Sequence, residues 1–200
     1  MKIVDIRELE TLKYLKGYGI DYTTRQGGNG YWEIVSRAGI ERLRDELENG
    51  TVYTDGAMIV ACDVDKEHVV MLREYRVSAG KYVYMFPAGL VEPGEAIETA
   101  SMREFKEETG LDLDVVSVSP ARYVSVGIVN ERVNVAYGVY SGTPSKDYQT
   151  EHEEADILFV DKKEAVRILS EEEVSIRSAL ILESLYKLNP FVEEMRSKSV

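Results

Sequence analysis

The sequence predicts an α+β fold with a mixed β-sheet, and three observations favour this class. Short apolar runs typical of strands fill the middle of the chain, one long run of helix formers interrupts them, and two helical segments close the chain. The 200 residues can form one large core or one domain with an extension. We expect residues 1–50 to form an N-terminal antiparallel β extension and residues 51–200 to form the main domain.

The first 50 residues predict a hairpin followed by a short helical or loop segment. Residues 21–24 and 31–35 alternate between polar and apolar side chains, as strands with one buried face do. The glycine-rich residues 26–30 between them are typical of a hairpin turn. Residues 39–49 carry apolar side chains at helical spacing among many charges, which predicts a short helix or a loop.

The rest of the chain reads as strands, one helix, more strands and two final helices. Apolar runs predict strands at residues 56–64, 68–76, 83–86, 115–118, 121–126, 132–140 and 157–160. Runs of helix formers predict helices at residues 96–109, 161–169 and 175–188. Gly110 stands where a helix over residues 96–109 would end. In the last helix Ile176, Leu180, Ile181 and Leu185 are expected to share one apolar face.

The charge and the cysteine content exclude several classes of protein. The formal charge is −12, from 24 basic and 36 acidic side chains, so a nucleic acid is not an expected partner. An acidic protein that handles phosphates needs a divalent cation between itself and the substrate. No apolar run is long enough to cross a membrane, and no signal peptide is visible, so no membrane partner is expected. The single cysteine fits a reducing, cytoplasmic location.

The most informative residues are acidic side chains on the predicted helix over residues 96–109. Glu104, Glu107 and Glu108 are three and four positions apart, so their carboxylates share one helix face. Like charges destabilise such a face, and a hard divalent ion with oxygen ligands would offset the repulsion. Arg103 on the same helix can hold and orient one of these glutamates. A glutamate-rich helix is also commonly only a solvated face, and the wider motif decides between the two interpretations.

The stretch from Gly89 to Leu111 resembles the Nudix box. Seven fixed positions of that motif match: Gly89, Glu95, Arg103, Glu104, Glu107, Glu108 and Gly110. Phe105 departs from the motif, because the family has an aliphatic residue there, and we expect a repacked helix contact.

Residues outside the box resemble the ADP-ribose pyrophosphatase branch of the family. An arginine-containing run, residues 73–76, precedes a Pro-Ala-Gly loop at residues 87–89, and Met85 stands where that branch has a glutamate. Residues 123–131 are similar to a Ser-Pro-Gly loop followed by a glutamate, with Val126 in place of the proline. An acidic run at residues 151–154 stands where the branch has an acidic loop.

The resemblance implies a Nudix α/β/α sandwich around a mixed sheet, and it assigns roles to particular residues. Glu104 and Glu108, with the carbonyl of Ala88, would hold Mg²⁺ or alternatively Mn²⁺, and Glu107 can share in this. The general base would be Glu153, with Glu151 and Glu154 as alternatives. Arg76 and Glu131 are expected to bind substrate. Glu107 and Arg103 are expected to be catalytic as well, and Gly89, Glu95 and Gly110 would have structural roles in the box.

The expected reaction is Mg²⁺-dependent hydrolysis of the pyrophosphate bond of a nucleoside diphosphate sugar, ADP-ribose first, to AMP and ribose 5-phosphate. Two alternatives stay open. One is a Nudix hydrolase of another nucleotide, such as GDP-mannose, NADH or a dNTP, and the other is a sensor that binds ADP-ribose without cleaving it. The resemblance also implies a homodimer with exchanged N-terminal strands.

Overall fold

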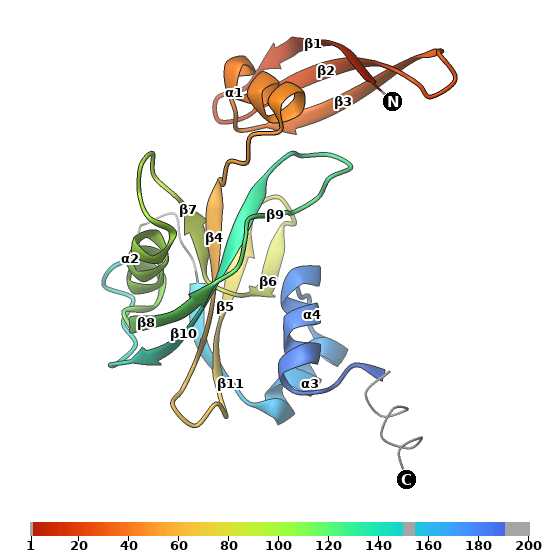
Figure 1. Cartoon of the computed structure of the whole chain (residues 1–200). Helices are drawn as coiled ribbons and strands as arrows, with labels where there is room; N and C mark the ends of the chain where they lie inside the picture. Colours follow the sequence, from red (N-terminus) through yellow and green to blue (C-terminus); the bar gives the residue numbers. More distant parts are fainter. Residues whose placement is uncertain (1, 150–154, 191–200) are drawn as a thin grey trace. The chain divides into compact units, whose positions relative to one another are not determined.

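A computed structural model describes residues 2–149 and 155–190, and the contacts divide the chain into two compact units (Figure 1). The first unit contains Met1–Gly56 and Ser119–Asn134, and the second contains Ala57–Val118 and Val135–Val200. The division of the chain at residue 50 into an extension and a main domain stays a prediction.

A three-stranded antiparallel sheet forms the centre of the first unit. Its strands are β1 (Lys2–Thr11), β2 (Lys16–Thr23) and β3 (Asn29–Ser36), in that order, and a short turn at residues 24–28 joins the last two, as predicted. The helical segment that follows is α1 (Ile40–Arg44), continued by a π-helical turn at Asp45–Asn49. Together they bury a small core of Ile6, Tyr18, Ile20, Ile34, Ala38 and Leu43.

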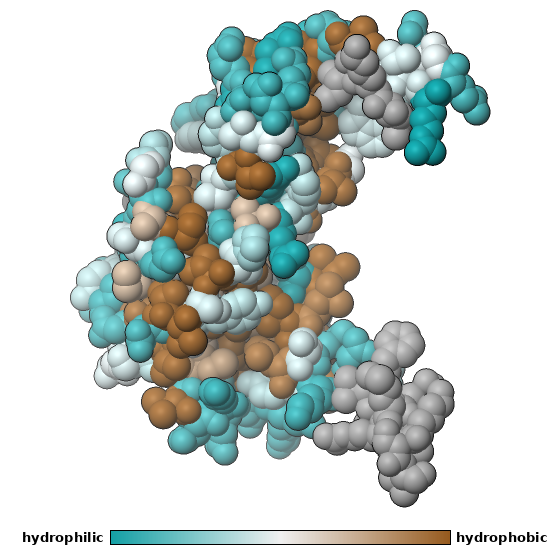
Figure 2. Space-filling model, in the orientation of Figure 1, coloured by the Kyte–Doolittle hydropathy of each residue, from teal (hydrophilic) through white to brown (hydrophobic). Residues whose placement is uncertain are grey.

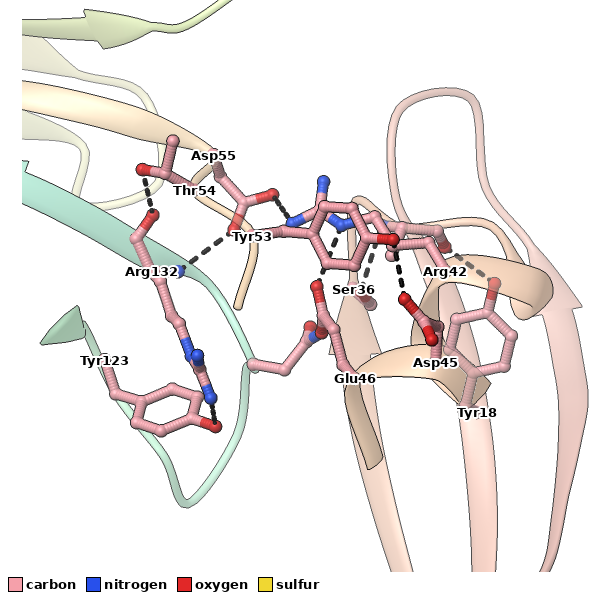
Figure 3. Close-up of polar contacts among 12 residues, drawn as sticks. Tyr18, Ser36, Arg42, Asp45, Glu46, Tyr53, Thr54, Asp55, Tyr123 and Arg132 are labelled. Carbon is pink, nitrogen blue, oxygen red and sulfur yellow. Dashed lines mark hydrogen bonds and ion pairs between the residues drawn. The ribbon is translucent and has the colours of Figure 1, made fainter. Parts of the chain in front are cut away.

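Polar contacts explain why residues 119–134 belong to the first unit (Figure 3). The Asp55 carboxylate accepts hydrogen bonds from the guanidinium of Arg42 at 2.7 Å and from the backbone N–H of Arg132 at 3.0 Å. Asn130 donates to the carboxylate of Glu46 at 2.6 Å. The strand in this part of the chain is shorter than the one predicted at residues 121–126. Only β9 (Arg122–Tyr123) pairs with β10 there.

The remaining strands belong to one sheet with the order β11-β5-β4-β10-β8, on which β6 pairs with β5, β7 with β4 and β9 with β10. The pairings of β5 with β4, β6 and β11 are antiparallel, as is that of β10 with β8. The strands are β4 (Gly56–Cys62), β5 (Val69–Arg76), β6 (Lys81–Met85), β7 (Ala88–Leu90), β8 (Asp112–Val118), β10 (Arg132–Ser141) and β11 (Ala155–Val160). The helices are α2 (Ile97–Thr109), α3 (Lys162–Glu171) and α4 (Ile176–Leu185).

Helices cover both faces of this sheet, which confirms the predicted α/β/α sandwich (Figure 1). Successive side chains of a strand point to opposite faces, and β4 shows this directly. Ile59 and Ala61 pack with Phe105 of α2, whereas Met58 and Val60 pack with residues of α3 and α4. Both faces of β4 are buried, which explains its unbroken apolar sequence.

Of the four apolar residues expected to share one face of the last helix, Ile181 packs against the core, whereas the other three are exposed. Ile176 and Leu180 are 76% and 58% exposed, whereas Ser178 and Leu182 are fully buried on α4. The side chain of Ser178 is turned inward because its Oγ accepts a hydrogen bond from the backbone N–H of Phe86 at 3.2 Å. The buried face of α4 therefore combines this polar contact with the packing of Ile181 and Leu182.

The surface of the chain is mixed in character. Hydrophilic residues gather at the lower end of the second unit in Figure 2, where the turn between β4 and β5 carries two aspartates, a lysine and a glutamate. Among the described residues, no helix is long and apolar enough to cross a membrane.

Candidate active site

The helix α2 supplies most of the predicted site, and its buried face fixes its rotation. Ala100, Ser101, Phe105 and Thr109 are fully buried, and Glu104 and Glu108 lie partly buried along the edge of this buried face. Met102, on the same helix, is 42% exposed. The helix ends at Gly110, whose φ of 71° is the left-handed conformation that glycine adopts without strain.

Arg103 lies at the centre of the acidic cluster and joins its members. Its Nε and Nη2 donate to the two carboxylate oxygens of Glu95 at 3.0 and 2.9 Å, a bidentate pair. Its Nη1 donates to Glu104 at 2.8 Å and more weakly to Glu107 at 3.4 Å, and Nη2 also reaches the carbonyl of Leu90 at 3.1 Å. Arg103 therefore orients more than the single glutamate that the sequence suggested.

The Arg103–Glu95 pair shifts both ionisable groups toward their charged forms. Hydrogen bonds from Arg103 hold the pKa of the Glu95 carboxyl below its usual value, helped by the backbone N–H of Glu92. The pKa of Arg103 is raised, chiefly by its hydrogen bonds to Glu95. Glu95 thus fixes the arginine that in turn fixes the glutamates of the helix.

Strand β7 and the loop that follows it as far as Glu95 lie against the carboxylates of α2. The backbone N–H of Ala88 donates to the Glu108 carboxylate at 3.0 Å. A Cβ placed on Gly89 would lie 1.9 Å from the Cδ of Glu104, so only glycine leaves room for that carboxylate. β7, the loop and the helix thus form one cradle, and the missing side chain of Gly89 leaves room in it for the Glu104 carboxylate.

The donor set fits a hard divalent ion that completes its shell with other oxygens. Among the residues that the structure describes, no three acidic, histidine or cysteine side chains form a preassembled metal cage. Mg²⁺ normally uses one or two carboxylates together with water and phosphate oxygens, so it needs no such cage. Glu104 and Glu108 supply carboxylates. Because Gly89 has no side chain, the backbone at residues 88 and 89 can lie close to these carboxylates.

Three of the predicted site residues, Glu151, Glu153 and Glu154, lie outside the described residues. Arg76 ends β5, and its guanidinium pairs with Glu74 of the same strand at 2.7 Å. Glu131 lies in the first unit, where it pairs with Arg37 at 3.2 Å. The roles of these residues in binding and catalysis stay predictions.

Gln149 contacts the last turn of α2, and sequence reasoning did not identify it. Its side-chain amide donates to the backbone carbonyl of Glu108 at 2.7 Å, across 41 positions of sequence. No local sequence pattern predicts such a contact, because a single glutamine in a loop has no periodicity or spacing to interpret. The acidic run that follows it was the only indication that this part of the chain is near the box.

Comparison with known proteins gives a consistent result. The family model of the NUDIX domain matches residues 52–190. The chain is 32% identical to an ADP-sugar pyrophosphatase of Mus musculus over 95 residues, 48% of this chain and 44% of that protein. It is 29% identical to an ADP-ribose pyrophosphatase of Bacillus subtilis (strain 168) over 136 residues, 64% of this chain and 74% of that protein. This chain therefore spans less than half the length of the mouse relative.

A solved structure shows the same fold. The crystal structure of an ADP compounds hydrolase superposes with a TM-score of 0.67 over 94% of this chain and 95% of that chain, at 17% identity. The family match covers the carboxylate cradle of α2 and its loop as well as the sandwich around them. With the box residues assembled as described and the family model matching most of the sequence, the chain belongs to the Nudix family and resembles its ADP-ribose pyrophosphatase branch.

Proposed function

We propose that this protein hydrolyses the pyrophosphate bond of a nucleoside diphosphate sugar, ADP-ribose first, with Mg²⁺ or Mn²⁺ as cofactor. One observation carries the proposal: residues 88–95 and α2 form a cradle. In it Arg103 binds Glu104, the Ala88 N–H binds Glu108, and Gly89 leaves room for the Glu104 carboxylate. This geometry is specific to a site that presents carboxylates. A merely solvated helix face would need neither the glycine nor the bidentate arginine.

Each residue of the cradle has a distinct part in the proposal. Glu104 and Glu108 hold the cation, Glu107 can share in this, and the carbonyl of Ala88 adds an oxygen ligand. A bound divalent ion supplies Lewis acidity toward the diphosphate. Arg103 keeps the glutamates in place, so little reorganisation is needed when the substrate arrives.

The proton of the attacking water goes to a carboxylate of the acidic run. Glu153 is our first choice of general base, with Glu151 and Glu154 as alternatives. Arg76 would bind a phosphate, because a guanidinium matches two phosphate oxygens at once, and Glu131 would contact the rest of the substrate. The products would be a nucleoside monophosphate and a sugar phosphate.

The relatives named ADP-ribose pyrophosphatase and ADP-sugar pyrophosphatase support an ADP-sugar as substrate. Val126, in place of the proline typical of the branch, leaves GDP-mannose and other nucleotides as the alternatives to test. The first experiment measures phosphate release, with added phosphatase, from ADP-ribose, GDP-mannose, UDP-glucose and dGTP, each with Mg²⁺, Mn²⁺ or EDTA. Metal-dependent release from ADP-ribose above the others is expected. Binding of ADP-ribose by calorimetry with no product would instead indicate a sensor.

Substitution of single glutamates tests the metal assignment. Glu104→Gln and Glu108→Gln remove charge at nearly constant shape, and each should lower kcat by several powers of ten. Glu98→Gln is the matched control, because Glu98 is exposed in the first turn of the same helix. Full activity of both box variants would exclude Glu104 and Glu108 as metal ligands.

We further propose a cytoplasmic homodimer with exchanged N-terminal strands. Its first unit exposes apolar side chains, including Trp32 at 49% and Val126 at 68%. Both line an open apolar hollow of about 350 Å³ within that unit. Sedimentation equilibrium tests this directly, and a monomer at micromolar concentration would refute the dimer.

A further inference from the structure

Glu74 is a largely buried carboxylate of β5 that stands outside the acidic cluster of α2. Its side chain is only 16% exposed, although glutamate is rarely buried without a partner. The residues in register with it are apolar, Val83 on β6 and Ala155 on β11. A charged carboxylate among apolar neighbours needs a partner that replaces the lost water. The group that Glu74 contacts therefore indicates its role.

The partner of Glu74 is Arg76, two positions further along the same strand. Nη1 of the arginine donates to one carboxylate oxygen at 2.7 Å, and the described residues provide neither side chain with a second ion pair. A guanidinium has five N–H donors, and this contact uses one of them. The side chain of Arg76 is 46% exposed, so its other donors can reach a ligand from solvent. Glu74 thus holds one end of the guanidinium and leaves the rest of it accessible.

Both side chains lie on the face of the sheet on which α2 packs. Side chains of a strand alternate between its two faces, and Val70 of β5 packs with Phe105 of α2. The pairings of β5 with β6 and β11 keep an unbroken register, so Glu74 and Arg76 face the same side as Val70. The carboxylate cradle belongs to the same helix. The pair is therefore directed to the side of the sheet where the proposed reaction would take place.

We propose that Glu74 is a positioning residue, which holds the guanidinium of Arg76 in the orientation that binds a phosphate of the substrate. The inference rests on the proposed function, because that function gives Arg76 a phosphate to bind. A guanidinium matches a phosphate only when two of its N–H groups are directed at phosphate oxygens. Fixing a long, exposed side chain costs conformational entropy, and a carboxylate that holds the arginine beforehand lowers this cost of binding.

Two substitutions of Glu74 test the proposal by steady-state kinetics with the best substrate. Glu74→Leu removes the acceptor and suits the apolar neighbours, while the half-exposed Arg76 can be solvated, so the protein should still fold. This variant should raise KM about tenfold and change kcat less than about twofold, because a contact made equally in the ground state and the transition state affects binding alone. Glu74→Gln keeps an acceptor oxygen in nearly the same place and should stay within about threefold of the wild-type KM.

Glu173→Leu is the matched control. The Glu173 carboxylate pairs with Lys81 of β6 at 2.6 Å, and Lys81 is in register with Arg76. The control therefore breaks an ion pair beside Arg76 without removing the partner of the arginine, and it should leave KM unchanged. A wild-type KM in Glu74→Leu would overturn the proposal. A lowered KM would overturn it as well, because Glu74 would then compete with the phosphate for Arg76.

A double-substitution cycle with Arg76→Gln separates positioning from a structural role. Arg76→Gln removes the group that Glu74 is proposed to orient, so adding Glu74→Leu to it should raise KM no further. Effects on KM that multiply in the double variant would show that Glu74 acts independently of Arg76. That result would refute the positioning role even if Glu74→Leu alone raised KM.

A binding measurement distinguishes failure of this inference from failure of the proposed function. A wild type that releases phosphate from none of the nucleotides refutes the proposed hydrolysis, and calorimetry with ADP-ribose and Mg²⁺ then measures the same contact as a dissociation constant. Glu74→Leu should weaken this binding about tenfold, and Glu74→Gln should leave it within about threefold. Equal binding by the wild type and Glu74→Leu would refute the inference, as would a wild type that binds no ADP-ribose.

Discussion

Replacement of Gly89 by alanine should remove most of the activity while the fold survives. The added Cβ would stand 2.0 Å and 2.4 Å from the two carboxylate oxygens of Glu104. An ordinary contact needs about 3.5 Å, so the carboxylate must move by roughly 1.5 Å. The move breaks its hydrogen bond from Arg103, worth about 1.5–3 kcal/mol, and alanine returns about 0.4–1 kcal/mol by restricting the unfolded chain.

The net loss of stability is therefore about 0.5–2.6 kcal/mol, whereas kcat/KM should fall by at least about a hundredfold. Calorimetry measures the first quantity and phosphate release from the best substrate measures the second. Gly28→Ala is the control, because a Cβ there meets only the Thr24 hydroxyl at an ordinary 3.4 Å. Undiminished activity in Gly89→Ala, with the protein folded, would refute the argument that Gly89 makes room for a catalytically required carboxylate.

Two further predictions concern the framework of the site. Arg103 holds the pKa of Glu95 below its usual value, so the Glu95 carboxylate stabilises the fold at neutral pH, and this stabilisation is lost as the pH falls below about 4. The thermal midpoint of the wild type should exceed that of Glu95→Gln at pH 7, and the difference should shrink toward pH about 3; a constant difference would contradict the pair's role. Gly110→Ala should cost more stability in urea unfolding than Gly94→Ala. Both have positive φ, a cost of about 1–2 kcal/mol, but only Gly110 also faces the Ser145 backbone at 2.5 Å. Equal losses would show that the Ser145 contact adds nothing.

The features that depend on local spacing could be predicted from the sequence. The positions of Glu104, Glu107 and Glu108 within two turns predicted a shared acidic face, and Arg103 beside them predicted an orienting cation. Both are present, since helical geometry alone brings these side chains together. The sandwich could be predicted in the same way, because strands that are buried on two faces, such as β4, have unbroken apolar sequences.

Contacts between distant positions could not be predicted in this way. Gln149 reaches Glu108 across 41 positions, and Asp55 reaches the backbone of Arg132 across 77. Nothing local marks either partner. The burial of Ser178 on α4 was missed for a related reason, since its hydrogen-bond partner is the backbone of Phe86, which is 92 positions away.

The two units are interleaved along the chain, which crosses from one to the other at three places: after Gly56, after Val118 and after Asn134. Residues 119–134 are therefore an inserted part of the first unit, and Asp55 and Glu46 hold them there. A graft that exchanged only residues 1–50 for those of a relative would leave the nearly buried Asp55 carboxylate without Arg42 and Asn130 without Glu46. In such hybrids the N-terminal segment and residues 119–134 have to be exchanged together, from the same parent protein.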